Sequence, residues 1–302
     1  METQKKILIL KSSQDSFENY YNERMKRKNI DISPVYRYNT GLLRKISVLW
    51  IQYFHFPIKG IWYGTWTKYI EEYDQIIVFD RILGFDILSY IHRKNPKARI
   101  IFWYWNIAKK MIPDKYRKYC EVWSFDEKDC LKYNFRKNIQ FYFEQSQLST
   151  RNESTIDAFF VGRDKGRYKQ IKYLYDFLLS QNLKVDFRIV DSVHNSELCI
   201  NKPMNYEEII RLIKNSKCIV EFTQQEQTGL SARALEALFF HKKLITNNIN
   251  MQNEKMYSPD NVFILGKDSM DKLKEFINKP YHNCNENMER EYSYDTWVKN
   301  FE

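Results

Sequence analysis

Two short segments in the second half of the chain decide the fold: residues 160–167 read FVGRDKGR, and residues 228–238 read TGLSARALEAL. The first segment ends an apolar run, as a β-strand does, and continues as a basic turn that contains glycine. The second begins with small polar residues and continues as a helix rich in Leu and Ala. Cationic side chains and the backbone amides at the start of a helix both bind phosphate oxygens. The two segments together therefore predict a site for a nucleoside diphosphate.

Around these segments, short apolar and β-branched runs alternate with helical patterns along the chain. In the first half the runs lie at residues 7–10, 75–79, 99–103 and 121–124. In the second half they lie at residues 158–161, 185–190, 218–222, 243–246 and 262–265. Continuous apolar strands separated by helices are typical of parallel sheets that are covered on both faces. The predicted fold class is α/β.

The length of 302 residues is sufficient for two cores of about 150 residues each. Polar residues from Gln145 to Ser154 interrupt the alternation, and this stretch is the predicted linker. We therefore predict two Rossmann-like domains, residues 1–150 and residues 151–302, that face a central cleft. In each of them a ligand is expected beyond the carboxyl ends of the parallel strands.

The two segments, together with the strand KKLIT at residues 242–246, resemble the donor-binding half of GT-B glycosyltransferases. The resemblance is to the small bacterial enzymes of capsule, exopolysaccharide and lipopolysaccharide assembly. It is best across residues 157–265 and weaker at residues 76–143 and 294–298. It implies a hexosyltransferase-like enzyme that moves a sugar from a nucleotide-sugar, with UDP as the expected nucleotide, to a bacterial surface glycan or its lipid-linked precursor. It also implies that the last helix crosses back to the first domain.

The resemblance assigns the diphosphate to Arg163 and Lys165, which would act in catalysis by offsetting charge on the leaving group. The alternative is a solvated basic turn. Glu236, which falls outside the apolar stripe of its helix, is expected to accept hydrogen bonds from the ribose, and a surface ion pair with Arg233 is the alternative. The other expected donor-binding residues are Gly162, Arg167, Thr228, Gly229, Leu230 and Ser231.

One position departs from the family pattern. Many retaining members have a glutamate eight residues before the ribose glutamate, where this chain has Thr228. Glu221 and Glu226 are near but off register. The sequence therefore does not decide between retention and inversion of the anomeric configuration, and a degenerate homologue that binds nucleotide without turnover is an alternative.

No metal is expected to take part in the reaction. The chain contains no Asp-x-Asp triplet, and its five histidines show no ligand spacing. The basic turn would then take the place of a metal ion, and no cofactor is expected beside the nucleotide-sugar substrate.

The first predicted domain is expected to bind the acceptor. Trp105 and Asn106 end an aromatic strand, where a ring can stack on a sugar and an amide can bind its hydroxyls; a packed aromatic strand end is the alternative. An inverting enzyme needs a carboxylate base for the acceptor hydroxyl. Asp80 and Asp126 end neighbouring strands and are the candidates, with a helix cap or a loop position as the alternative.

The net charge of +10 favours polyanionic partners. The alternative is a biased base composition of the genome, since the chain is rich in Lys, Asn, Ile and Tyr throughout. Residues 42–69 mix aromatic and aliphatic side chains with Lys and Arg, which suits an anionic bilayer surface; packing of the first domain or a dimer contact is the alternative. A basic, non-catalytic nucleic-acid-binding protein is the rival of another class. It explains the charge but not the ordered donor segments, so no nucleic acid partner is expected.

Cysteine usage and the first residues favour the cytoplasm. The five cysteines are odd in number and form no Cys-x-x-Cys pair, and the apolar run at residues 7–10 is too short for a signal peptide. We expect a cytoplasmic protein, peripheral on the inner face of the cell membrane if residues 42–69 contact lipid.

Overall fold

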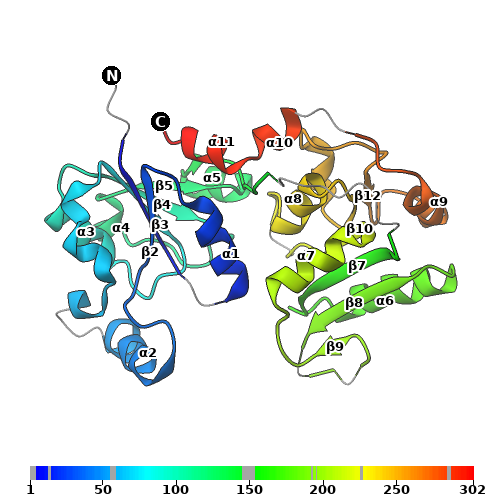
Figure 1. The fold of residues 1–302 in the computed structure, drawn as a ribbon, viewed down its shortest axis with the longest axis horizontal. Coiled ribbons are helices and arrows are strands. Elements are labelled where there is room, and N and C mark those ends of the chain that lie inside the picture. The colour runs from blue at the N-terminus through cyan, green and yellow to red at the C-terminus, as the bar shows by residue number, and fades with distance from the viewer. Residues whose placement is uncertain are drawn as a thin grey trace. The chain divides into compact units, whose positions relative to one another are not determined.

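The computed structural model describes residues 5–12, 15–54, 59–144, 154–191, 193–194, 196–224, 227–283 and 287–302. The chain divides into two compact units, Met1–Asn138 and Ile139–Glu302 (Figure 1). The predicted linker, Gln145 to Ser154, lies outside the described residues except for Ser154.

The first unit contains a six-stranded parallel sheet in the order β2-β1-β3-β4-β5-β6. Its strands are β1 Ile7–Lys11, β2 Ile30–Pro34, β3 Gln75–Phe79, β4 Arg99–Tyr104, β5 Glu121–Ser124 and β6 Arg136–Lys137. Its helices are α1 Ser16–Met25, α2 Gly41–Val48, α3 Asp86–Lys94, α4 Asp114–Arg117 and α5 Glu127–Tyr133, with a π-helix at Leu49–Tyr53 directly after α2. Short 3₁₀ helices lie at Lys59–Trp62, Thr65–Lys68 and Ile70–Glu72.

The central strands of this sheet form because most of their residues are apolar on both faces. All five residues of β1 and of β3 are buried, as helix-covered parallel strands require. Leu8 and Leu10 point into one core cluster with Ile87 and Leu88 of α3. The chain order reverses between β1 and β3, so the switch point of the sheet lies at the carboxyl ends of these two strands.

The second unit contains a six-stranded parallel sheet in the order β12-β11-β10-β7-β8-β9. Its strands are β7 Ile156–Arg163, β8 Val185–Val190, β9 Cys199–Ile200, β10 Ser216–Glu221, β11 Lys243–Thr246 and β12 Val262–Ile264. Its helices are α6 Tyr168–Ser180, α7 Tyr206–Lys214, α8 Ala232–Phe239, α9 Leu273–Asn278, α10 Asn287–Glu291 and α11 Tyr294–Lys299, with 3₁₀ helices at Ile249–Asn253 and Met270–Lys272. The switch point of this sheet lies between the carboxyl ends of β7 and β10.

Two local features support the second unit. Asn205 caps α7 by accepting a hydrogen bond from the Glu207 amide at 3.0 Å. Within the same unit, Phe141 packs against Trp297 of α11, with ring centroids 4.6 Å apart. The predicted crossing of the last helix to the first domain stays a prediction.

The segment at residues 42–69 divides into two parts, with residues 55–58 outside the described chain. Trp62, Tyr63 and Trp66 are buried in the core of the first unit, so the bilayer contact expected for these rings is wrong. Residues 42–54 instead expose large apolar side chains. Within the described ranges, we find no helix that combines the length and the apolar character needed to cross a bilayer.

Candidate functional site

The basic turn follows β7 and leads into α6, at the switch point of the second sheet. The Asp164 carboxylate closes the turn by accepting hydrogen bonds from the amides of Gly166 at 3.1 Å and Arg167 at 2.9 Å. Lys165 and Gly166 have φ angles of 49° and 78°, and glycine at the second position accepts this left-handed conformation without strain. The side chains of Arg163 and Lys165 are exposed on this turn, where they can reach an anion.

Arg167 fixes the turn through hydrogen bonds to backbone carbonyl oxygens. Its guanidinium donates to the carbonyl oxygens of Arg163 at 2.6 Å and Asp164 at 3.0 Å, and also to that of Phe222, the residue after β10. Burial lowers the pKa of Arg167. The expected donor contact of Arg167 would compete with these three carbonyls, and its hydrogen bonds connect the end of β7 to the end of β10.

Ser231 begins α8 at the other side of the switch point. Its hydroxyl oxygen accepts from the amides of Arg233 at 3.0 Å and Ala234 at 3.4 Å, and its proton is donated to Glu221. Glu221 ends β10, is buried, and also accepts from the Thr246 hydroxyl at 2.7 Å. Burial raises the pKa of Glu221. The Ser231 hydroxyl, expected to bind phosphate, is therefore engaged within the protein.

The structural role of Glu221 could not be predicted from the sequence, because Glu221 does not lie at the position of the glutamate in the family pattern. It links the start of α8 to the ends of β10 and β11. The Thr228 carbonyl accepts a hydrogen bond from the Asn248 amide, after β11, at 3.5 Å, and Leu230 is buried. The loop at residues 228–230 is thus fixed by Asn248 at its start and by the contact between Ser231 and Glu221 at its end.

Glu236 lies inside the second unit. Helix α8 is buried from Ala234 to Phe239, so the expected separation of Glu236 from a buried stripe is wrong. The Arg233 guanidinium forms an ion pair with Glu236, and the Tyr206 hydroxyl donates to it at 2.6 Å. Burial raises the pKa of Glu236, and the charge of Arg233 acts in the opposite direction.

The alternative of an ion pair between Arg233 and Glu236 is therefore present, but the pair is buried and does not lie on the surface. Tyr142 extends the network, with its hydroxyl 2.8 Å from that of Tyr206. The ribose contact of Glu236 stays a prediction, and a ribose would have to replace one of these partners.

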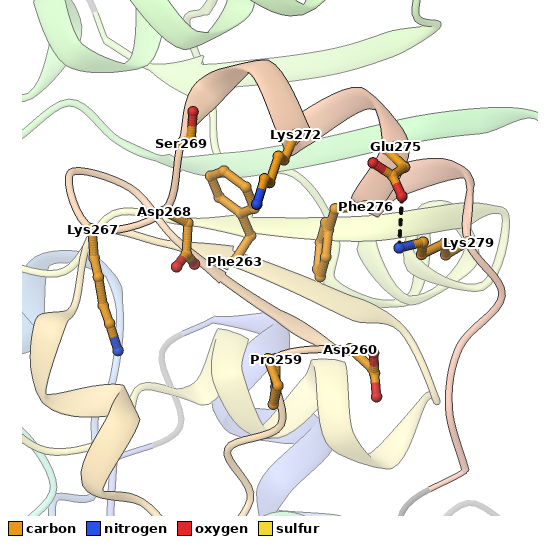
Figure 2. A pocket seen from close by; sticks show the side chains of 10 residues that line it. All are labelled: Pro259, Asp260, Phe263, Lys267, Asp268, Ser269, Lys272, Glu275, Phe276 and Lys279. Carbon is orange, nitrogen blue, oxygen red and sulfur yellow. Dashed lines mark ion pairs between the residues drawn. The ribbon is translucent and has the colours of Figure 1, made fainter.

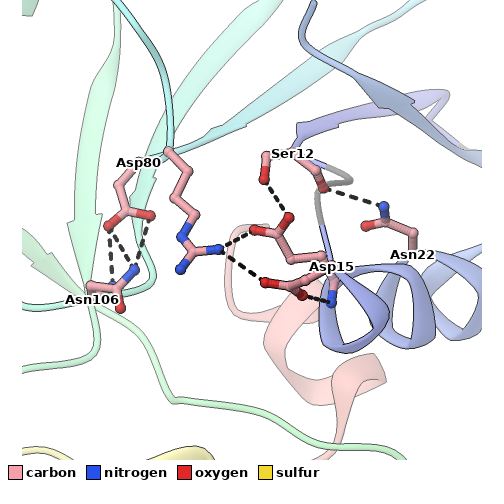
Figure 3. A network of polar contacts seen from close by, with 7 residues as sticks. Ser12, Asp15, Asn22, Asp80 and Asn106 are labelled. Carbon is pink, nitrogen blue, oxygen red and sulfur yellow. Dashed lines mark hydrogen bonds and ion pairs between the residues drawn. The ribbon is translucent and has the colours of Figure 1, made fainter. Parts of the chain in front are cut away.

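A polar network lies at the switch point of the first sheet, at the ends of β1 and β3 (Figure 3). The Glu18 carboxylate is fully buried and accepts from the Ser12 hydroxyl at 2.5 Å and from Arg81. The Asn22 amide donates to the Ser12 carbonyl at 3.3 Å, and Asp15 caps α1 through the Glu18 amide at 2.8 Å. Sequence reasoning missed Ser12 and Glu18, which carry no motif.

Asp80 and Asn106 are brought together at the same edge (Figure 3). The Asp80 carboxylate accepts from the backbone amide of Asn106 at 3.2 Å and from its side-chain amide at 3.1 Å. Burial raises the pKa of Asp80 to about 6, against the opposing effect of these hydrogen bonds. A carboxylate with this pKa can accept a proton near neutral pH.

The other two residues expected on the acceptor side are enclosed. Asp126 is fully buried and caps α5 by accepting from the Asp129 amide at 3.3 Å, the alternative that the sequence left open. Trp105 is 8% exposed, with the Phe17 ring stacked on its ring at 5.6 Å and the ammonium of the buried Lys11 at 4.4 Å from its ring centroid. Trp105 would have to move before a sugar could stack on it.

A cavity of about 410 Å³ lies elsewhere in the second unit, beside β12 and α9 (Figure 2). Phe263 and Phe276 line it, with ring centroids 5.5 Å apart, and Lys279 forms an ion pair with Glu275 at 2.7 Å on its rim. It shares no residue with the predicted donor site. Over the described residues, no group of three or more His, Cys, Asp or Glu side chains is arranged to hold a metal.

Comparison with known proteins supplies the fold family. The chain is similar to the apo form of the lipopolysaccharide outer core galactosyltransferase WaaB, with a TM-score of 0.50 and 13% identity over 99% of this chain and 98% of that one. The chain has the GT-B fold. The predicted fold class, with two Rossmann-like domains, is therefore confirmed.

Other comparisons add little to this GT-B chain. A 3-phosphoglycerate dehydrogenase from Entamoeba histolytica is similar with a TM-score of 0.22 and 10% identity over 81% of this chain and 72% of that one. A phosphoglycerate oxidoreductase from Vibrio cholerae is similar with a TM-score of 0.27 and 8% identity over 99% of each chain. Scores this low carry no argument about function. No family model and no curated protein matches the sequence.

Proposed function

We propose that this GT-B protein is a glycosyltransferase that moves a sugar from a nucleotide-sugar, with UDP as the nucleotide, to a bacterial surface glycan or its lipid-linked precursor. The supporting observation is the meeting of the basic turn and the start of α8 at the switch point of the second sheet. Open parallel sheets bind ligands at this position. A turn with two exposed cations next to a helix start suits a diphosphate.

The donor site would act by stabilising the leaving group. As the bond between the sugar and the diphosphate breaks, its electron pair remains on the diphosphate, and Arg163 and Lys165 offset the growing charge. Gly162, Thr228 and Gly229 line the same edge. Because Arg167 and Glu221 hold the two loops, the charges need no rearrangement during the reaction.

The acceptor would bind at the switch point of the first sheet. In an inverting reaction, Asp80 would take the proton of the attacking hydroxyl, and Asn106 would hold the carboxylate in place. The geometry favours Asp80 over Asp126, because Asp126 is fully buried as a helix cap. No divalent metal is needed in this scheme, since cationic side chains take its place.

We further propose that residues 42–54 rest on an anionic membrane surface. Leu42, Ile46, Leu49 and Tyr53 are spaced by three or four residues on α2 and the π-helix, so they share one side. Their exposed fractions are 72%, 37%, 47% and 65%. Lys45 is exposed beside them, and basic residues next to an apolar helical face are typical of interfacial helices.

Vesicle sedimentation tests the membrane proposal. We expect binding to phosphatidylglycerol vesicles at low salt and weaker binding to phosphatidylcholine vesicles. The Leu42→Ser/Leu49→Ser variant should stay in solution, whereas Leu131→Ser, which changes a leucine that is 80% exposed on α5, should bind as the wild type does. Equal binding of all three proteins would reject the proposal. Dimerisation that only the double variant loses would make these residues a contact between copies.

A panel of nucleotide-sugars, assayed for release of UDP or GDP, tests the function directly. We expect hydrolysis of one donor without acceptor and thermal stabilisation by the matching nucleoside diphosphate. Salt-sensitive binding to arbitrary oligonucleotides, without stabilisation by UDP or GDP, would instead support the nucleic-acid-binding class. Stabilisation without turnover of any donor would indicate a degenerate homologue.

A further inference from the structure

A histidine–aspartate pair lies at the carboxyl end of β8, beside the basic turn. Strand β8 pairs with β7, and Val190 lies opposite Arg163 in the register. Asp191 directly follows Val190, so it lies one strand away from Arg163 at the same edge of the sheet. None of the sequence motifs includes Asp191 or His194.

The imidazole of His194 is held on two sides. Its Nδ1 lies 2.5 Å from the Asp191 carboxylate, and its ring stacks on that of Tyr168, the first residue of α6, with centroids 4.0 Å apart and planes 6° apart. Asp191 also accepts from the backbone amides of His194 at 2.8 Å and Val193 at 3.1 Å. These hydrogen bonds lower the pKa of Asp191 to about 2, so it is a carboxylate at neutral pH.

A carboxylate on Nδ1 fixes the orientation of an imidazole and leaves Nε2 for a ligand. The His194 side chain is 39% exposed, so it can be reached from solvent. An imidazole of fixed orientation is thus available at the edge of the sheet where Arg163 and Lys165 already lie.

A second histidine, His241, is also paired with a carboxylate and stacked on a tyrosine, but it lies at the other end of the strands. The pairing alone therefore does not indicate a ligand site, and it is the position of His194 that distinguishes it. His241 Nε2 lies 2.7 Å from Glu289, and its ring stacks on Tyr281 with centroids 5.5 Å apart and planes 9° apart. His241 precedes β11, so it lies at the amino end of the strands, away from the switch-point edge. It provides an internal control for the effect of removing a paired histidine.

We propose that His194 binds a phosphate oxygen of the nucleoside diphosphate through Nε2, with Asp191 and Tyr168 as its positioning residues. The proposal rests on the proposed function and adds a third side chain, beside Arg163 and Lys165, to the donor site. It requires no movement of the Arg167 or Glu221 contacts. His194 would therefore contribute to holding the diphosphate both before and after the sugar leaves.

Calorimetric titration of the full chain with UDP and with uridine tests the proposal, with GDP and guanosine as the second pair. We expect His194→Ala to weaken binding of the diphosphate about tenfold or more, as loss of a hydrogen bond to a charged group does, and to leave nucleoside binding unchanged. Asp191→Asn should weaken diphosphate binding less. His241→Ala should bind as the wild type does.

Melting temperatures of the variants identify any loss of folding. Unchanged diphosphate affinity in His194→Ala would overturn the proposal, as would an equal loss of nucleoside affinity or an equal loss in His241→Ala. If the wild type binds neither UDP nor GDP, the proposed function itself fails. A wild type that binds, together with an unaffected His194→Ala, removes only the assignment of His194.

Discussion

Replacing Glu236 with alanine is expected to destabilise the second unit as well as to weaken the donor contact predicted for this residue. The carboxylate is fully buried and is paired with Arg233. Removing it leaves a guanidinium without its charge partner. Breaking a buried ion pair from one side costs about 3–5 kcal/mol.

The structure places this variant at the lower end of that range. The Arg233 side chain is 22% exposed, so water can reach the unpaired guanidinium. The Tyr206 hydroxyl loses Glu236 as a partner but keeps the Tyr142 hydroxyl, 2.8 Å away. The stability lost through Tyr206 is therefore small. We therefore expect a loss of about 3 kcal/mol for Glu236→Ala, and about half of that for Glu236→Gln, which keeps an acceptor for Tyr206.

Hydrogen exchange measured by mass spectrometry suits this test, because a chain of two compact units need not unfold in one step. Peptides from α8 and β10 should exchange faster in Glu236→Ala, and peptides from β3 in the first unit should not change. The double variant Arg233→Met/Glu236→Leu should recover most of the loss, because it removes both charges together.

A loss below about 1 kcal/mol in Glu236→Ala, with UDP affinity reduced tenfold or more, would refute the structural argument. Glu236 would then act as a ligand of the donor alone. The opposite result, a large loss of stability with uridine affinity preserved in the folded fraction of Glu236→Gln, would remove the ribose contact.

Three further predictions concern the reaction. Arg163→Ala should lower kcat by about a hundredfold with a smaller change in KM, because its charge matters most as the leaving group departs; normal turnover in a donor-release assay would remove Arg163 from the mechanism. Because the pKa of Asp80 is raised to about 6, kcat/KM in an inverting reaction should fall as the pH is lowered through about 6. Asp80→Asn should abolish that pH dependence. The Asp80→Asn variant should also be at least as stable as the wild type at pH 8, because a carboxyl whose pKa is raised on folding destabilises the folded state above that pKa. Treatment with EDTA should leave the rate unchanged, and restoration of a lost rate by Mg²⁺ or Mn²⁺ would contradict the expected metal independence.

The buried strands could be predicted from the sequence because each is a continuous apolar run. The run at residues 75–79 matches β3, and the run at 121–124 matches β5. The edge strands β2, β6 and β9 were missed. They are only partly buried or exposed, and two of them contain two residues, so they have no hydrophobic signal to read.

The candidate site could be predicted only where one local segment determines it. The exposed cations at Arg163 and Lys165 follow from a strand, a glycine turn and a helix in immediate succession. The burial of Glu236 depends on Tyr206 and Tyr142, which are 30 and 94 residues away in the chain and carry no motif. The packing of Trp105 likewise depends on Phe17 of α1.

Each of the two switch points contains a buried glutamate that accepts hydrogen bonds from two side chains of neighbouring segments. In the first unit Glu18 accepts from Ser12 and Arg81, and in the second unit Glu221 accepts from Ser231 and Thr246. A buried carboxylate with all its partners in place holds loop backbone more rigidly than apolar packing does, although it contributes little net stability. Rigid loops at the carboxyl ends of the strands keep charged groups oriented before a ligand arrives. The positions of Glu18 and Glu221 are therefore better explained by the demands of a binding site than by the stability of the fold.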